Sequence, residues 1–330
     1  MTSTLHHKQT DRLLFGLSLL ALLWSFGVLQ AGGFTTSINA GMAFLDWPLS
    51  NGSVNPPGWL TESDKFAEHS HRLAATGLGI LTILIAITHW LREPRRAVRL
   101  AAYSTLALVV AQGGLGGLRV LLDQLNIGGD SNIKAVTFAI VHAINAQLTV
   151  TLLACVTLTH TRLWHRAAED AAPAPSRWLG IATLVLLILV MLAAAIMRQN
   201  RATLWADGET TNLEGYFIPA IGDGWMWTIN VLHRAGALLA AVSMTLFANS
   251  LNGLQIGFSF RPRLPHPQWS GRLSVILFIL LTLQIFLGVL AVTRPFNPHP
   301  RTIHLMVAAA LLATTTCATL LCRRGTYHHS

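Results

Sequence analysis

Four histidines carry the strongest chemical signal in this sequence. The set consists of His71, His142, His233 and His304. The first lies 71 residues before the second, and the third lies 71 residues before the fourth. Two neutral imidazoles can ligate one haem iron as axial ligands, and haem is an apolar disc suited to the interior of a helix bundle. Two such pairs therefore predict two haem-sized sites.

Eight long apolar segments surround these histidines, each of about 20 residues and thus long enough to cross a bilayer as a helix. The predicted segments are Leu13–Ala31, Leu73–Leu91, Leu100–Leu122, Ala135–Thr157, Trp178–Met197, Trp225–Phe247, Leu273–Val292 and Ile303–Leu321. Only 11% of the residues are charged, whereas a soluble domain carries about 25%. Strands of a membrane barrel would be shorter and would alternate in polarity. We therefore expect an all-α membrane protein with eight transmembrane helices.

The helices are predicted to form two tandem, pseudo-symmetric four-helix bundles. Residues 1–165 make up the N-terminal bundle and residues 178–330 the C-terminal bundle, and the basic, Pro- and Ala-rich stretch 166–177 is a predicted cytoplasmic linker. In each half a long outer loop precedes a helix with a His-Arg pair. A helix led by glutamine follows, Gln112 or Gln284, and the last helix carries the second histidine. Because each half has an even number of helices, the repeats are parallel.

Basic residues predict the orientation of the chain in the inner membrane. With both termini in the cytoplasm, the inner segments hold fourteen Lys and Arg residues and the outer segments hold seven, as the positive-inside rule requires. The net charge of +9 is therefore interpreted as topology rather than as nucleic-acid binding. The first segment lacks a small-residue cleavage site and is expected to be retained. Cys155, Cys317 and Cys322 fall near the cytoplasmic side, so no extracytoplasmic disulfide is expected.

This topology places all four histidines in the outer half of the bilayer. We expect His71 and His304 near the starts of their helices, and His142 and His233 about 10 Å further in. A lone histidine at a helix end is more often a capping or interfacial residue. Ionisable residues inside membrane segments are costly and usually functional, however, so four in equivalent places favour joint ligation.

The other histidines lack this pattern. His69 is the one neighbour that could be confused with His71. The histidines assigned to cytoplasmic helix ends or loops are His89, His160, His165 and His266. The tails hold His6, His7, His328 and His329, and an outer loop holds His299.

Charged residues next to the histidines differ between the two halves. Arg72 and Arg234 each follow a candidate ligand, where a guanidinium can bind a haem propionate or extend to lipid phosphate. Glu68 lies three residues before His71 and shares its helix face, whereas Asn230 holds the matching position. A carboxylate at one site alone predicts that this site reacts and the other transfers electrons. The alternative is a first-turn glutamate favoured by the helix dipole.

Tryptophan and proline are frequent in the outer loops, as in Asp46-Trp47-Pro48 and Pro56-Pro57-Gly58-Trp59. Such tryptophans could form an interfacial aromatic belt or a lid over a cofactor. Both interpretations stay open at this point.

At these residues the sequence resembles the haem A synthase family of respiratory membranes. The resemblance rests on Glu-x-x-His-Arg at Glu68–Arg72 and on the His-Arg pair at His233. It also includes the Gln-x-x-Leu-Gly pattern at Gln112–Gly116 and Gln284–Gly288, and the stretch Gly41–Pro48. The order of these motifs extends over nearly the whole chain.

The resemblance implies oxidation of the C8 methyl group of haem O to a formyl group, which gives haem A for cytochrome oxidase. It further implies that His233 and His304 ligate a resident haem b, that His71 and His142 hold the substrate haem, and that Glu68 assists the oxidation. A haem O synthase and an electron-transfer protein are candidate partners, and the oligomeric state is left open.

This chain departs from the family at one place in the first outer loop. Many bacterial members carry a cysteine pair there, and the matching residues here are Phe44 and Ser50. A di-haem b carrier that passes electrons from quinol without modifying haem is the alternative function. A transporter with intramembrane histidines would predict broken helices and polar residues at the membrane midplane, and the sequence has little of either.

Overall fold

The computed structural model describes residues 11–124, 132–167, 174–200, 224–252, 268–294 and 297–324. Its helices are α1 (Arg12–Ser37), α2 (Ser63–Arg92), α3 (Arg96–Gln124), α4 (Ile133–Thr159), α5 (Arg162–Arg166), α6 (Ala174–Gln199), α8 (Trp225–Leu251), α9 (Gln268–Thr293) and α10 (Pro298–Arg324). Within these ranges, eight helices are long and apolar enough to span a membrane. The predicted all-α membrane fold is therefore confirmed.

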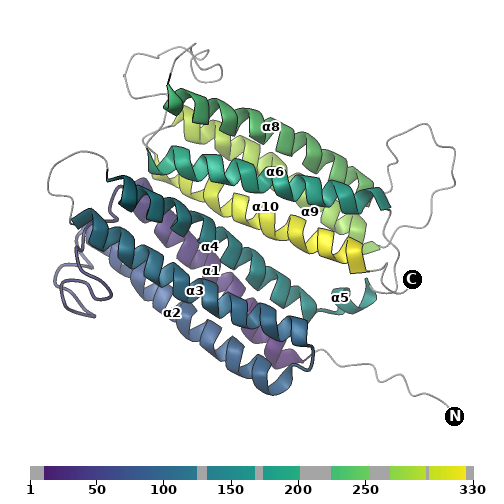
Figure 1. Cartoon of the computed structure of the whole chain (residues 1–330), viewed down its shortest axis with the longest axis horizontal. Helices are drawn as coiled ribbons and strands as arrows, with labels where there is room; N and C mark the ends of the chain where they lie inside the picture. The colour runs from purple at the N-terminus through teal and green to yellow at the C-terminus, as the bar shows by residue number, and fades with distance from the viewer. Residues whose placement is uncertain are drawn as a thin grey trace.

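The long helices run side by side (Figure 1), and their order in the chain divides them into two groups. One group consists of α1 to α4, and the other of α6, α8, α9 and α10. The groups meet where α10 packs against α1 and α4, and where α6 packs against α4. Of the predicted linker, residues 168–173 lie outside the described residues, as do residues 201–223 of the second outer loop.

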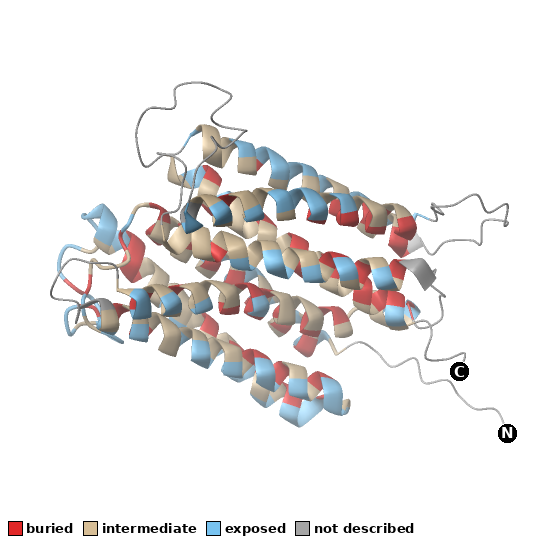
Figure 2. Ribbon diagram, turned by 45° about the horizontal axis from the view of Figure 1, so that its top comes forward, coloured by how far each residue is buried: buried red, intermediate tan, exposed pale blue. Residues whose placement is uncertain are grey.

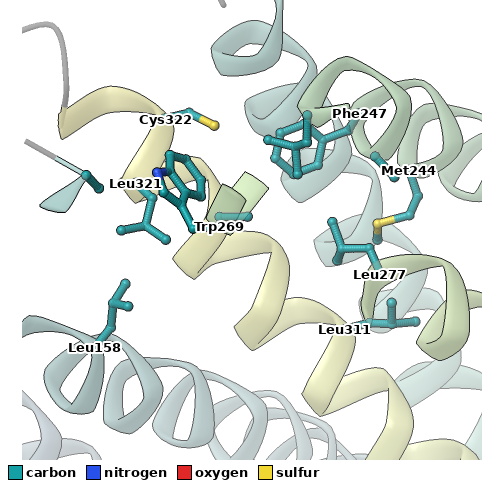
Figure 3. Packing of buried hydrophobic residues seen from close by; sticks show 12 residues of the cluster. Leu158, Met244, Phe247, Trp269, Leu277, Leu311, Leu321 and Cys322 are labelled. Carbon is teal, nitrogen blue, oxygen red and sulfur yellow. The ribbon is translucent and has the colours of Figure 1, made fainter. Parts of the chain in front are cut away.

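The outward faces of the helices carry large apolar side chains. Leu238 is 70% exposed and Ile279 is 61% exposed, as expected of residues that face lipid. Buried residues lie between the helices (Figure 2). The largest buried cluster includes Phe247 of α8, Leu277 of α9 and Leu311 of α10, and Leu158 of α4 extends it into the first group (Figure 3).

The membrane helices other than α8 begin before the apolar segments that were predicted, and α8 begins at Trp225 as predicted. α2 starts at Ser63 rather than near Leu73, and α10 starts at Pro298. The expectation that His71 and His304 lie near helix starts is therefore wrong, since His71 is eight residues in and His304 six. Polar residues of the first turns continue the helix beyond the hydrocarbon core, where a hydropathy pattern does not detect them.

Candidate functional site: two pairs of imidazoles

The four histidines lie six to nine residues after the starts of α2, α4, α8 and α10. At 1.5 Å per residue this corresponds to depths of about 9 to 14 Å along each helix. His71 and His142 are within electrostatic range of each other, and so are His233 and His304. Each half of the protein therefore brings together one imidazole from each of two helices, α2 and α4 in the first half and α8 and α10 in the second. We call the end of the molecule that carries these pairs and the loop 38–62 the loop end.

Backbone carbonyls orient three of the four imidazole rings. Nδ1 of His142 lies 3.2 Å from the carbonyl oxygen of Gln112, and Nδ1 of His304 lies 3.1 Å from that of Gln284. Nδ1 of His233 lies 3.3 Å from the carbonyl oxygen of Val190. Donation from Nδ1–H to a carbonyl leaves the lone pair on Nε2, which is the usual arrangement of a metal-ligating histidine.

Glycines make room for the rings. A Cβ atom at Gly116 would lie 3.1 Å from Cε1 of His142, and one at Gly288 would lie 3.3 Å from Cε1 of His304. Each of these glycines follows its glutamine by four residues, on the same face of the helix. The Gln-x-x-Leu-Gly pattern thus supplies a carbonyl acceptor and the space beside the ring that it orients.

His71 is held more tightly by its neighbours than the other three. A Cβ atom at Gly32 of α1 would lie only 2.6 Å from Cε1 of His71. Nδ1 of His71 is buried and has no hydrogen-bond partner in the described part of the chain. Contact with Gly32 therefore restricts this ring, and the backbone of Val28 lies within reach of it.

The two glutamines are held differently. The amide of Gln112 donates to the carbonyl oxygen of His142 at 3.0 Å, and its Oε1 accepts from Asn145 at 2.6 Å. In the second half, Nε2 of Gln284 lies 3.2 Å from Nε2 of His304. Because an amide NH2 group can only donate, this contact is consistent with a lone pair on Nε2 of His304.

Glu68 and Arg72 fasten the first outer loop to α2. Glu68 is 4% exposed, and its carboxylate accepts bonds from Arg72 at 2.5 Å and from the backbone N–H of Phe44 at 3.1 Å. Arg72 also donates to the carbonyl oxygens of Phe44 at 3.2 Å and Asp46 at 2.7 Å, and to that of Leu49. The Glu68–Arg72 pair has the i,i+4 spacing of a helical ion pair, whereas the contacts with Phe44, Asp46 and Leu49 could not be predicted because they involve backbone groups of a distant loop.

The first outer loop closes over the first pair of histidines. The Trp47 ring lies so close to Gly117 that a Cβ atom there would be 2.5 Å from it, next to the glycine that faces His142. Asp46 accepts bonds from the backbone N–H groups of Asn51 and Gly52 at 2.7 Å each. Partial burial raises the pKa of Asp46, but these bonds outweigh it and hold the pKa below its ordinary value. The contacts favour the lid interpretation of Trp47 over a purely interfacial belt.

His69 of α2 contacts the first outer loop. Its Nδ1 lies 3.0 Å from the hydroxyl of Ser50, and its ring lies 4.7 Å from that of Trp59. Arg234 follows His233 on α8 and is partly exposed. Of the residues predicted to form the sites, the structure thus joins Glu68 to Arg72 directly and brings the histidines together in pairs.

Another pair of imidazoles lies at the opposite end of α2 and α4. Nε2 of His89 is 3.0 Å from Nε2 of His160, and Nδ1 of His89 is 2.8 Å from the carbonyl oxygen of Ile85. An ion pair of Glu93 with Arg95, at 2.7 Å, closes over His160. Burial, followed by the charges of His89 and Arg95, lowers the pKa of His160 to about 4.

Sequence reasoning missed this second pair, although a signal exists. His89 follows His71 by 18 residues and His160 follows His142 by 18, which is five helical turns. Both therefore lie on the faces that carry the first pair. The matching positions in the second half are Leu251 and Cys322, which belong to the apolar cluster (Figure 3).

The donor set fits a six-coordinate haem iron in each half. The imidazoles lie in pairs and are half-buried, three of them have Nδ1 directed at a carbonyl, and glycines flank three of the rings. The fold is that of a multi-pass membrane protein, and each histidine pair could hold one haem.

Comparison with known proteins agrees with this class. The family model of COX15-CtaA, described as cytochrome oxidase assembly protein, matches residues 16–316. This chain belongs to that family. Among its relatives are proteins named heme A synthase, at 24% identity. The one from Bacillus cereus (strain AH187) aligns over 288 residues, 87% of this chain and 86% of the relative. The one from Bacillus mycoides (strain KBAB4) aligns over 301 residues, which is 91% of this chain and 90% of the relative.

Proposed function

We propose that this protein is a haem A synthase, an oxidoreductase that converts the C8 methyl group of haem O to a formyl group. Membership of the cytochrome oxidase assembly family supports the proposal, as do relatives named heme A synthase along most of the chain. The observation that carries it is the two histidine pairs, of which, among the described residues, only the first has a buried carboxylate, Glu68, one helical turn from one of its histidines.

The two sites are proposed to have different tasks. Oxidation of a methyl to a formyl group releases four electrons and four protons when water supplies the oxygen. The reaction therefore needs an acceptor for the electrons and an acceptor for the protons. A haem b between His233 and His304 would supply one-electron transfer. The substrate haem would lie between His71 and His142, beneath the loop that Arg72 and Glu68 hold in place.

Glu68 is the proposed proton acceptor at the substrate site. Its carboxylate is nearly inaccessible and is already oriented by Arg72 and by the N–H of Phe44. As a carboxylate it can take up a proton at Oε2 when the methyl carbon is oxidised. Asn230 at the matching position of α8 cannot do so, which supports assigning the oxidation to the first half.

The proposed orientation of the protein in the membrane follows from its basic residues. Both termini would lie in the cytoplasm and the loop end would face the extracytoplasmic side of the inner membrane, because the segments opposite the loop end carry most of the basic residues. Arg72 and Arg234 would lie near the propionates. In the structure Arg72 already binds the loop and Glu68, so its contact with a propionate would have to compete with these bonds.

The catalytic assignment is tested by Glu68→Gln, with Glu62→Gln as matched control. Glu62 is the N-cap residue of α2, six residues before Glu68; its side chain is 51% exposed and forms an ion pair with Lys65. In cells that also make haem O, Glu68→Gln should retain resident haem b but give no haem A, and Glu62→Gln should behave as wild type. Full haem A formation by Glu68→Gln would rule out the proposed role.

A further inference from the structure

Two arginines of the second half meet on the last turn of α1. Arg198, at the end of α6, donates from Nη2 to the carbonyl oxygen of Gly33 at 2.7 Å and to the hydroxyl of Ser37 at 2.9 Å. Arg301, in the first turn of α10, donates from Nη2 to the carbonyl oxygen of Ser37 at 3.2 Å. Because both guanidinium groups bind one residue, they lie close together at the loop end.

Among the described residues, no carboxylate neutralises the positive charge of these two arginines, because neither Arg198 nor Arg301 forms an ion pair with one. The C-terminus of α1 offers only about half a negative charge. In addition, Nε of Arg301 is buried and has no hydrogen-bond partner in the described structure. A buried donor without a partner is costly, so the arrangement calls for an anion.

The arginine pair lies directly beside one of the imidazole sites. Arg301 precedes His304 by three residues and therefore lies one turn nearer the loop end on the same face of α10. Arg198 is within electrostatic range of both His304 and Arg301. Each guanidinium group has five N–H donors, and the bonds described above use only Nη2 of each. The remaining donors suit the oxygens of a carboxylate.

We propose that Arg198 and Arg301 bind the propionate carboxylates of the haem held between His233 and His304. The inference rests on the proposed haem at the second site but not on the oxidation of haem O. It adds Arg198 and Arg301 to Arg234, which is proposed above to lie near the propionates of the same haem. Since the same guanidinium groups also bind Gly33 and Ser37, the bound haem would tie the second half of the protein to α1 of the first.

The test compares binding of iron protoporphyrin IX with binding of its dimethyl ester, which lacks both carboxylates. The haem-free protein is titrated in detergent, in a His71→Ala background so that only the second site retains both histidines. The parent protein should bind the free acid at least about tenfold more tightly, the size of one charge-assisted hydrogen bond. Arg301→Gln and Arg198→Gln should each reduce this preference.

The matched control is Lys134→Gln, which removes an exposed positive charge at the loop end of α4 and should retain the full preference. Arg301→Lys keeps the positive charge but lacks the planar guanidinium group, so its preference for the free acid should lie between those of the parent and Arg301→Gln. This variant keeps the test decisive if Arg301→Gln does not fold. Removal of Arg301 should also lower the midpoint potential of the bound haem, because a nearby positive charge favours the reduced form.

An unchanged preference in Arg198→Gln and Arg301→Gln, or in Arg301→Lys if the glutamine variant is lost, would overturn the inference. So would a parent protein that binds acid and ester equally. Absence of haem A formation would count against the proposed function alone, because this titration does not depend on turnover.

Discussion

Gly32 of α1 offers a sharp test of the first imidazole pair. A Cβ atom there would lie 2.6 Å from Cε1 of His71 and 3.0 Å from both ring nitrogens. Ordinary carbon–carbon contact needs about 3.5 Å, so Gly32→Ala must move the ring by about 1 Å. The backbone around His71 has little freedom to follow, because Trp24 and Thr35 of α1 hydrogen-bond to the carbonyl oxygens of Ala74 and Ala67 at 2.8 and 3.0 Å.

A displacement of this size is large for a metal ligand. Iron–nitrogen distances tolerate about 0.2 Å, and a misplacement of about 1 Å at a reacting centre costs roughly 100-fold in rate. We therefore expect Gly32→Ala to lower haem A formation about 100-fold and to weaken haem binding at the first site, whereas the second site keeps its low-spin electron paramagnetic resonance signal.

Gly27→Ala is the matched control, since it lies on the same helix and a Cβ atom there meets nothing within 4 Å. It should behave as wild type. Haem content, the resonance signal and haem A are measured for both variants. If Gly32→Ala turned over haem O at the wild-type rate, His71 would not be held as described.

Three further predictions concern the supports of the two sites. Asn145→Leu removes the donor to Oε1 of Gln112. The free energy of unfolding should decrease by about 1 to 3 kcal/mol, which is measured as a lower midpoint of thermal unfolding. The electron paramagnetic resonance signal of the first site should also become broader. Arg72→Gln releases the loop from α2 and should make residues 44–52 cleavable by added protease while the second site stays loaded. Because the pKa of His160 falls from 6.5 to about 4 on folding, unfolding takes up a proton between these values. The free energy of unfolding should then decrease by on the order of 3 kcal/mol as the pH falls from 6.5 to 4, and His160→Gln, followed by denaturant titration, should flatten that slope.

The sequence predicted the helices well because membrane burial requires long apolar segments, and it predicted the four histidines because they recur in the same order in each half. It placed the start of α2 ten residues too late, since the polar turn beginning at Ser63 continues the helix outside the apolar segment. The contacts of Arg72 and the carbonyl of Val190 could not be predicted, because they depend on the path of a loop and on helix packing. The pairing of His89 with His160 could have been found from its five-turn register.

The proposed conversion of haem O to haem A is tested by co-expressing the protein with a haem O synthase and identifying the extracted haems by liquid chromatography and mass spectrometry. Membranes that contain the protein should yield haem A, and membranes of a vector control with the synthase alone should yield none. Recovery of only haem O and haem B from membranes in which the protein is folded and haem-loaded would contradict this conversion, and would favour a di-haem electron carrier.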